Sequence, residues 1–263
     1  LDDTLSEHDA FKALGEVPAV ITAMIADGYT GRKGKGGFYR LNSEGEKEVV
    51  SLQDRSYHVA KRPKLLAVSA AKKAGLRALL EHDSAEGRYA WQVLSGTLCY
   101  AVSLLPEIAE NLSLIDSAMK LGYNWKQGPF ELIDAVGVDW FIAKLESNKL
   151  EVPKMLRLAE GRHFYQTKNG TLQFLSIDGS YQDLQRPQGV LLLEDIKRRS
   201  HRLFGNSQAS VWDIGEGVAC LEFHSKMNTL NPFIFLVLGK ALKQLPALHF
   251  KGLVLYNEGS NFS

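Results

Sequence analysis

The sequence predicts a multi-domain α + α/β protein, in which a mostly helical part is followed by an incomplete β-β-α-β unit. Three patterns support this fold class. Apolar residues recur every three or four positions through much of residues 8–145. An Asn169-Gly170 turn separates two strand-like runs. From residue 209 onward, two strand patterns, a helix pattern and a third strand pattern follow one another.

Length and composition describe an ordinary globular protein. The 263 residues are 45% hydrophobic and 23% charged, which excludes wholesale disorder and fibrous repeats. The formal net charge of +1 gives no bias toward nucleic acid or anionic lipid, so neither is expected as a partner. Cys99 and Cys220 lie in apolar patterns and are expected to be buried thiols, which favours a reducing, cytoplasmic setting. The longest apolar run covers residues 233–238, so no membrane span is expected.

The first half of the chain is predicted to be mainly helical. Segment 8–28 has the amphipathic period, and Pro18 either disturbs its first turn or starts the helix proper. A glycine-rich loop at 31–37 follows, and the polar segment 42–64 is expected to cross the surface. Pro106 is expected to kink or close one of the later helices. The later helices are predicted over residues 64–82, 86–111 and 114–121, and a fourth begins at Gly128-Pro129. Ser113 is expected to cap the helix over 114–121.

The character of the sequence changes after about residue 150. The elements predicted there are strands at 164–166, 171–177, 211–214, 218–223 and 253–256, and helices at about 190–203 and 231–245. A right-handed crossover through the last helix would place the final strand parallel to its partner. Ligand sites in such sheets lie beyond the carboxyl ends of the strands. Residues 257–263 are therefore predicted to be where a ligand site would lie.

Most common catalytic motifs are missing from the sequence. Loop 31–37 has glycines at phosphate-loop spacing, but Gly37-Phe38 stands where such a loop has Lys and Ser or Thr. A helix, not a strand, is predicted before the loop, so a cationic turn that ends a helix explains it better than a dinucleotide-binding turn. The 7 histidines lack metal-ligand spacing, and no Gly-x-Ser-x-Gly elbow is present. No catalytic residue and no metal ligand is assigned.

Several segments together resemble one group of enzymes. Residues 31–39 (GRKGKGGFY) resemble the GRKxGxGFY pattern that closes the first helical repeat of 3-hydroxyacyl-CoA dehydrogenases, with Lys35 where the pattern has glycine. Residues 125–137 resemble the GPFELxDxxG pattern of the second repeat, and Ile115, Asp116 and Met119 precede it as that repeat expects. Residues 224–263 resemble the opening of an enoyl-CoA hydratase (crotonase-like) domain, with HSKxNxL and GxNFS. This order resembles the multifunctional fatty-acid β-oxidation enzymes.

The resemblance implies a domain organisation. It implies a helical dehydrogenase C-terminal domain of the 6-phosphogluconate-dehydrogenase C-terminal-like type, followed by the start of a crotonase-like domain. The NAD-binding domain would lie before Leu1, so NAD is implied for the parent enzyme with no site in this chain. The chain begins at Leu1 rather than Met and is expected to be cut at both ends. The expected parts are 1–43, the end of the first helical repeat; 44–84, a linker and helix; 85–150, the second repeat; 151–208, a linker with hairpin and helix; and 209–263, the truncated crotonase-like start.

The resemblance also implies candidate site residues. In crotonase-like enzymes one N–H of the oxyanion hole comes from the turn after the third strand, which is Ser263 here, or Phe262 if the register slips by one. Such a donor stabilises the enolate oxygen of a thioester. Lys226, Met227 and Asn228 resemble the segment that lies against the adenine and pantetheine of CoA. The second N–H and the acid-base carboxylates would follow Ser263.

The expected function follows from this resemblance. The parent enzyme would hydrate 2-enoyl-CoA and oxidise 3-hydroxyacyl-CoA with NAD, and this chain would supply a helical substrate or dimerisation-type domain. The chain alone is expected to be inactive toward NAD, to bind an acyl-CoA thioester weakly, and to self-associate through exposed apolar surface. The alternative is a non-catalytic helical interaction module with a small α/β tail, which would bind no acyl-CoA. A more distant third is a phosphate-binding helical protein that uses loop 31–37.

Overall fold

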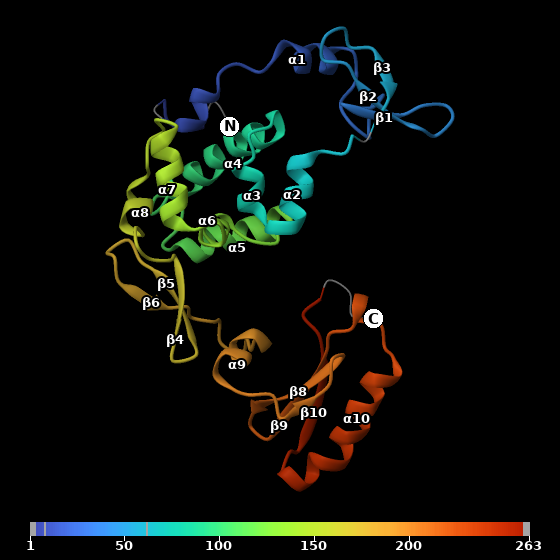
Figure 1. Cartoon of the computed structure of the whole chain (residues 1–263), viewed down its shortest axis with the longest axis vertical. Helices are drawn as coiled ribbons and strands as arrows, with labels where there is room; N and C mark the ends of the chain where they lie inside the picture. The colour runs from blue at the N-terminus through green and yellow to red at the C-terminus, as the bar shows by residue number, and fades with distance from the viewer. Residues whose placement is uncertain (1–3, 8, 62, 260–263) are drawn as a thin grey trace. The chain divides into compact units, whose positions relative to one another are not determined.

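The computed structural model describes residues 4–7, 9–61 and 63–259, and Figure 1 labels their helices and strands. By contacts between residues, the chain divides into two compact units, Leu1–Tyr100 and Ala101–Ser263. Helices dominate the stretch from residue 66 to residue 158, and both units also contain sheets. The mixed helical and sheet character of the predicted fold class is therefore confirmed.

The first unit begins with two helical segments where the sequence pattern predicts one. A 3-10 helix, η1 (Ala10–Leu14), is followed by the α-helix α1 (Ala19–Ala26). The prediction of a single helix over 8–28 is wrong because Gly15 has a φ of 81°, which lies outside the helical region. Pro18 is the residue just before the first helical residue of α1, so it starts the helix proper.

The polar segment after α1 forms a sheet that the pattern did not predict. Strands β1 (Tyr39–Leu41), β2 (Lys47–Val50) and β3 (Tyr57–Val59) pair antiparallel in that order. Arg40 Nε lies 2.7 Å from Glu48 Oε2, and the Arg40 guanidinium lies 3.9 Å from the centre of the Tyr57 ring. Of the strand residues, all of which are described, Val50 alone is buried. The sheet therefore shows little of the apolar alternation from which strands are recognised.

Three helices complete the first unit, the third of them running into the second unit: α2 (Leu66–Ala74), α3 (Leu76–Leu80) and α4 (Ala85–Ser103). Gly75 has a φ of 84° and separates α2 from α3, so the single helix predicted over 64–82 is wrong. Helix α4 ends at Ser103, earlier than the predicted residue 111. Pro106 has no N–H to donate to the carbonyl of Val102, so it closes this helix rather than kinking it.

The second unit begins with short helices that share an apolar core. They are α5 (Leu112–Tyr123), α6 (Pro129–Val136), α7 (Val138–Ser147) and α8 (Lys154–Leu158). Asn111, not the predicted Ser113, caps α5, because its Oδ1 accepts a hydrogen bond from the Ser113 N–H at 3.1 Å. The side chains with no exposed surface in these helices include Phe130, Ile133, Phe141, Leu145 and Leu156. Burial of these side chains supplies the main apolar stabilisation of the helical part.

A three-stranded antiparallel sheet follows the helices. Its strands are β4 (Tyr165–Lys168), β5 (Thr171–Leu175) and β6 (Tyr181–Asp183), paired in that order. The hairpin predicted around Asn169-Gly170 is confirmed, and both turn residues have the positive φ that such a turn requires. Strand β6 was not predicted.

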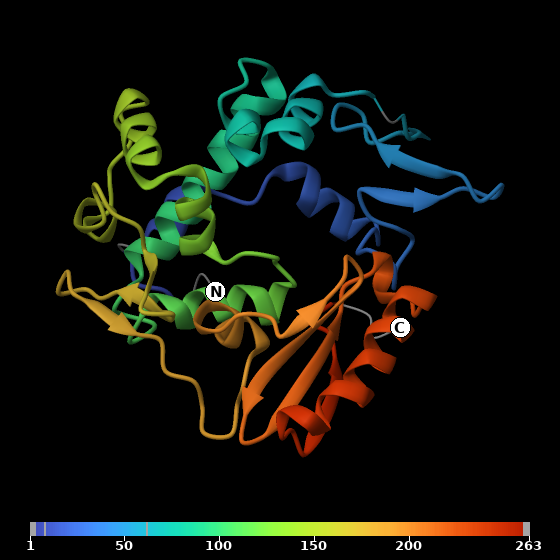
Figure 2. The same ribbon diagram turned by 60° about the horizontal axis from the view of Figure 1, so that its bottom comes forward.

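The last sheet of the chain has a helix on each face (Figure 2). Its order is β10-β9-β8-β7, with β7 (Phe204–Gly205), β8 (Ala209–Gly215), β9 (Val218–Phe223) and β10 (Gly252–Tyr256). Helix α10 (Pro232–Gln244) joins β9 to β10, which pair parallel as predicted. Val211 and Leu221 face α10, whereas Trp212 and Cys220 face α9 (Leu193–Arg199). The predicted β-β-α-β order is confirmed. The packing of α9 on the second face of this sheet was not predicted.

Candidate functional site

The carboxyl ends of β9 and β10 bring two predicted segments together. The strands are parallel neighbours, so the chain leaves both of them at the same edge of the sheet. The 3-10 turn η2 (Lys226–Asn228) follows β9, and residues 257–259 follow β10. Asn228 Nδ2 donates to Asn257 Oδ1 at 3.1 Å, and the Gly259 N–H donates to the same oxygen at 3.0 Å. Lys226, Met227, Asn228, Asn257 and Gly259 are hereafter the strand-end cluster.

The strand-end cluster combines a fixed backbone with exposed side chains. Met227 and Asn228 have φ values of 57° and 54°, a conformation that costs energy for residues other than glycine. A Cβ on Gly259 would lie 2.1 Å from Asn228 Nδ2, so a side chain there would push the Asn228 amide away from Asn257. Asn257 is buried, whereas Lys226 is exposed and Met227 is 71% exposed. The cluster therefore presents one cation and one apolar side chain to solvent.

The predicted site residues fall into two groups. Lys226, Met227 and Asn228 lie beside the turn after β10, where a ligand site beyond strand ends is expected. Their contact with CoA stays a prediction. The oxyanion-hole candidates Phe262 and Ser263 lie outside the described residues.

A buried polar arrangement in the second unit was missed at the level of sequence. The Asp116 side chain on α5 accepts hydrogen bonds from the Phe130 N–H (2.9 Å), the Glu131 N–H (3.2 Å) and the Tyr165 hydroxyl (2.8 Å). These N–H groups belong to the first turn of α6 and have no partner within that helix. Asp116 thus caps α6 from a neighbouring helix, and Gly128 lies directly against it. Asp116, Gly128, Phe130, Glu131 and Tyr165 are hereafter the Asp116 network.

Burial dominates the electrostatics of this network. It raises the pKa of Asp116 to about 6, although the hydrogen bonds from Phe130 and Tyr165 act in the opposite direction. Burial also raises the pKa of Tyr165, so its hydroxyl keeps the proton that it donates to Asp116. Asp116 is only 1% exposed and cannot reach a substrate in solution. We therefore assign it a positioning role within the fold and no acid-base role.

Asp134, near the C-terminal end of α6, binds the backbone at the start of β4. Its carboxylate accepts hydrogen bonds from the N–H groups of Phe164 and Tyr165, each at 2.8 Å. Tyr165 therefore binds Asp134 through its amide and Asp116 through its hydroxyl. The rings of Phe164 and Phe130 pack edge to face with their centres 4.9 Å apart. One signal in the sequence could have indicated this network. Asp116 is a carboxylate on the same side of its helix as the apolar residues Leu112 and Ile115.

The other chemical motifs have plain structural explanations. In loop 31–37, Gly31 and Gly36 form a β-bridge and Lys35 Nζ donates to the Asp27 carbonyl at 3.0 Å, so the loop closes on the end of α1 as the cationic-turn interpretation predicts. Burial raises the pKa of both Cys99 and Cys220 to about 11, which keeps the thiols protonated. Within the described ranges, no three His, Cys, Asp or Glu residues gather as a metal site. None of the described helices has the length and apolar character needed to cross a bilayer.

Part of this geometry is similar to a known protein family. Residues 89–167 match the family described as 3-hydroxyacyl-CoA dehydrogenase, C-terminal domain. A Bacillus subtilis (strain 168) protein named as a probable 3-hydroxyacyl-CoA dehydrogenase is 35% identical over 258 residues, which are 95% of this chain and 32% of that protein. Two proteins whose names propose a fatty acid oxidation complex trifunctional enzyme also match. The one from Rickettsia prowazekii (strain Madrid E) is 29% identical over 100% of this chain, and the one from Rickettsia felis (strain ATCC VR-1525 / URRWXCal2) is 30% identical over 98%; each match covers 33% of the relative.

The structure is mixed helical and sheet, and its residues 89–167 are similar to the 3-hydroxyacyl-CoA dehydrogenase C-terminal domain. The matched residues include the whole Asp116 network. The resemblance of residues 125–137 to this domain is therefore confirmed. The chain spans about a third of the length of the curated relatives it matches. No solved structure matches the chain.

Proposed function

We propose that this chain contributes the C-terminal helical domain, and the region after it, to an enzyme of fatty-acid oxidation that oxidises 3-hydroxyacyl-CoA with NAD. The observation that carries this proposal is the match of residues 89–167, within which the Asp116 network fixes α5, α6 and the start of β4 as one body. The relatives match along nearly the whole chain, which extends the similarity to the last sheet.

The role of the chain in this enzyme is structural. The glycine-rich loop 31–37 is closed by Lys35 and follows helix α1 rather than a strand, so it lacks the strand-turn-helix form of a dinucleotide-binding turn. NAD would accept the hydride in the complete reaction, and no step of that transfer is assigned to a residue of this chain. The chain supplies the folded helical domain, which would pack against the rest of the enzyme.

The region from residue 209 onward is proposed to begin a crotonase-like unit of the same enzyme, which hydrates 2-enoyl-CoA. The support is the parallel β9–β10 pair with the strand-end cluster at its carboxyl edge. Lys226, Met227 and Asn228 would lie against the CoA moiety of the thioester. A backbone N–H of Phe262 or Ser263 would stabilise the thioester oxygen as it gains negative charge.

Calorimetric titration of the 263-residue chain with crotonyl-CoA tests the site. We expect weak, saturable binding that becomes at least tenfold weaker in Lys226→Gln and is unchanged in Lys243→Gln, an exposed lysine on α10. Binding that is equal in both variants would remove the strand-end cluster from the proposal. Absence of any binding would favour a non-catalytic helical interaction module with a small α/β tail. The exposed apolar side chains of α10 are compatible with such a module.

An activity assay tests whether oxidation requires the parts of the enzyme outside this chain. NADH formation from 3-hydroxybutyryl-CoA is expected from the enzyme that contains this chain and not from the 263-residue chain alone. Turnover by the chain alone would contradict its structural role.

A further inference from the structure

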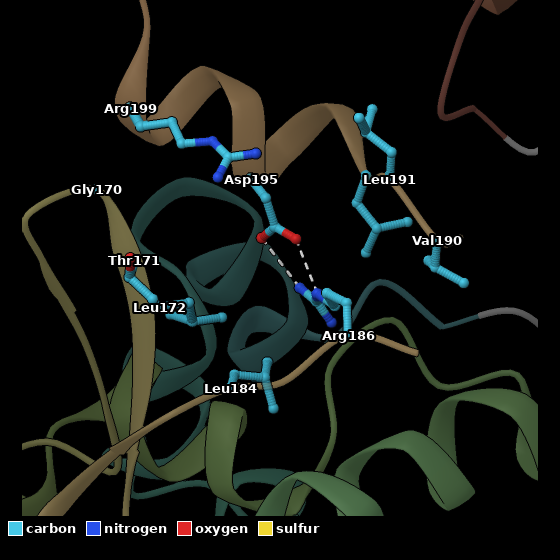
Figure 3. Close-up of a pocket in the computed structure, with 10 residues that line it drawn as sticks. Gly170, Thr171, Leu172, Leu184, Arg186, Val190, Leu191, Asp195 and Arg199 are labelled. Atoms are coloured by element: carbon cyan, nitrogen blue, oxygen red, sulfur yellow. Dashed lines mark hydrogen bonds and ion pairs between the residues drawn. The ribbon is translucent and has the colours of Figure 1, made fainter. Parts of the chain in front are cut away.

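A pocket lies between the small sheet β4–β6 and helix α9 (Figure 3). Its volume is about 250 Å³, and part of it is open to solvent. Leu172 on β5, Leu184 after β6 and Leu191 before α9 provide apolar wall. Arg186, Asp195 and Arg199 provide the charged part of the lining. The pocket belongs to neither the strand-end cluster nor the Asp116 network.

The charges of the lining do not cancel. Arg186 pairs with both carboxylate oxygens of Asp195, with Nε–Oδ2 at 2.8 Å and Nη2–Oδ1 at 3.1 Å. These hydrogen bonds lower the pKa of Asp195, so its charge persists over the physiological range. Arg199 has no carboxylate within ion-pair distance in the part of the chain that the structure describes. The lining thus holds one positive charge in excess.

The position of Arg199 directs this excess charge to the pocket. Figure 3 shows its side chain extending from α9 toward Asp195, over the space between Thr171 and Leu191. The turn at Gly170 lies so close that a Cβ there would be 2.6 Å from the Cβ of Arg199. This close approach holds the base of the arginine side chain against the β4–β5 turn. An arginine placed in this way is suited to a planar anion, because its N–H groups match the two oxygens of a carboxylate.

We propose that this pocket binds an aliphatic carboxylate, a monoanion with a short unbranched chain. The guanidinium of Arg199 takes the carboxylate, and Leu172, Leu184 and Leu191 take the hydrocarbon chain. One excess positive charge matches one carboxylate, and a free phosphate would leave the apolar walls without a partner. The inference is independent of the proposed enzymatic function, which does not involve these residues.

Calorimetric titration of the 263-residue chain with octanoate tests the proposal. We expect saturable binding with one octanoate per chain, weakened at least tenfold in Arg199→Gln. Arg202→Gln is the matched control, because Arg202 is an exposed arginine three positions further along that does not line the pocket. Leu191→Asp places a negative charge in the pocket wall at a half-exposed position. It is expected to weaken octanoate binding as strongly as Arg199→Gln does. Thermal unfolding of each variant shows whether it is folded.

Two further probes identify what the pocket recognises. 1-Octanol has the same chain without the charge and is expected to bind at least tenfold more weakly than octanoate. Inorganic phosphate at the same ionic strength is expected to leave octanoate bound. The proposal is overturned by absence of saturable octanoate binding, by equal affinity in Arg199→Gln and Arg202→Gln, by equal affinity for 1-octanol, or by displacement of octanoate by phosphate.

Discussion

Gly128 and Asp116 are in contact at a distance that excludes any side chain at position 128. An ideal Cβ there would lie 2.3 Å from the Asp116 Cβ and 2.4 Å from its Cα. The second of these atoms is backbone, so α5 and α6 would have to move apart. Separation of the helices would also lengthen the hydrogen bonds from Phe130 and Glu131 to the Asp116 carboxylate.

Gly128→Ala is therefore expected to lower the free energy of unfolding by about 3 kcal/mol, at the upper end of overpacking effects. Gly122→Ala is the control, because a Cβ at Gly122 would have no neighbour within 4 Å and alanine is the better helix former. Urea unfolding of both variants measures the effect. Equal midpoints for the two variants would show that the Gly128 contact relaxes without cost.

Asp116 makes the stability of the second unit depend on pH. Its pKa of about 6 in the folded chain exceeds the value of about 4 for an unfolded aspartate. The folded state therefore holds the proton more tightly, and this contribution is complete below about pH 4 and is lost as pH rises through 6. The loss amounts to about 3 kcal/mol at most.

Comparison of the chain with Asp116→Asn tests this dependence, because asparagine does not titrate. Between pH 4 and pH 7, the parent chain is expected to lose stability relative to the variant. Urea unfolding at unit pH steps gives the difference. A difference that does not change with pH would show that Asp116 has an ordinary pKa.

At the scale of elements, α9 is held to the last sheet by two carboxylates. Glu222 on β9 is buried and accepts hydrogen bonds from Lys197 Nζ on α9 and from Trp212 Nε1 at 3.2 Å. Glu258, after β10, accepts a hydrogen bond from the Leu193 N–H at 3.0 Å. The apolar side of α9 packs beside these contacts against Cys220 and Trp212. The helix therefore depends on strands that follow it in the chain.

Glu222→Gln is expected to weaken this attachment by about 1–2 kcal/mol. Lys197 and Trp212 donate to different oxygens of Glu222, and glutamine replaces one of these oxygens by an NH2 group that cannot accept and has no charge for Lys197. Trypsin should then cut after Lys197 or Arg198 several times faster than in the parent chain. Glu216→Gln, in the exposed turn between β8 and β9, serves as control. Identical cleavage rates in both variants would mean that Glu222 does not hold α9.

The sequence predicted those elements whose apolar pattern is strong. The β9–α10–β10 crossover and the hairpin at Asn169-Gly170 followed from apolar runs and turn residues. Strands β1–β3 were missed because they are half exposed and are supported by pairs such as Arg40–Glu48, which leave no apolar period. The location of α9 was missed because its partners Glu222 and Glu258 are distant in sequence.

The candidate site was predictable to a similar extent. The carboxyl edge of parallel strands is a general location for ligands, and this topology predicted a site at residues 257–263. Lys226 and Asn228 were candidates only through the resemblance to crotonase-like enzymes, and the structure places Asn228 beside Asn257. The Asp116 network could not be predicted, because Tyr165 lies 49 residues from Asp116 and no local pattern links them. The Arg199 pocket likewise depends on packing of α9 beside Gly170, which only the folded chain shows.

At the scale of the whole molecule, exposed apolar surface is the feature that bears on assembly. Phe233, Phe235, Leu236 and Leu242 on α10 are between 56% and 67% exposed. Exposed apolar side chains gathered on one helix favour association with another surface. The self-association expected from the sequence stays a prediction, and α10 is the place to test it.

Sedimentation of the 263-residue chain over a range of concentrations measures this association. We expect the weight-average mass to rise above 29.2 kDa with concentration, and to rise less in Leu236→Glu. Lys243→Glu changes charge on the same helix without removing apolar surface and should resemble the parent chain. A single monomeric species at high concentration would contradict the prediction.

The hydrogen bond from Leu193 to Glu258 has a consequence during protein synthesis. The two residues are 65 positions apart. A ribosome adds about 5–20 residues per second, so Leu193 leaves it about 3–13 s before Glu258 does. Leu193 and Ile196, which are buried in the folded chain, are uncovered until Trp212 and Cys220 have been made, and α9 lacks its contact with Glu258 for the whole interval. The nascent chain at this stage should therefore be a substrate for chaperones that recognise short apolar segments. Ribosome profiling of chaperone-bound chains would show occupancy that rises once residue 199 has emerged and falls between the emergence of residue 223 and that of residue 258.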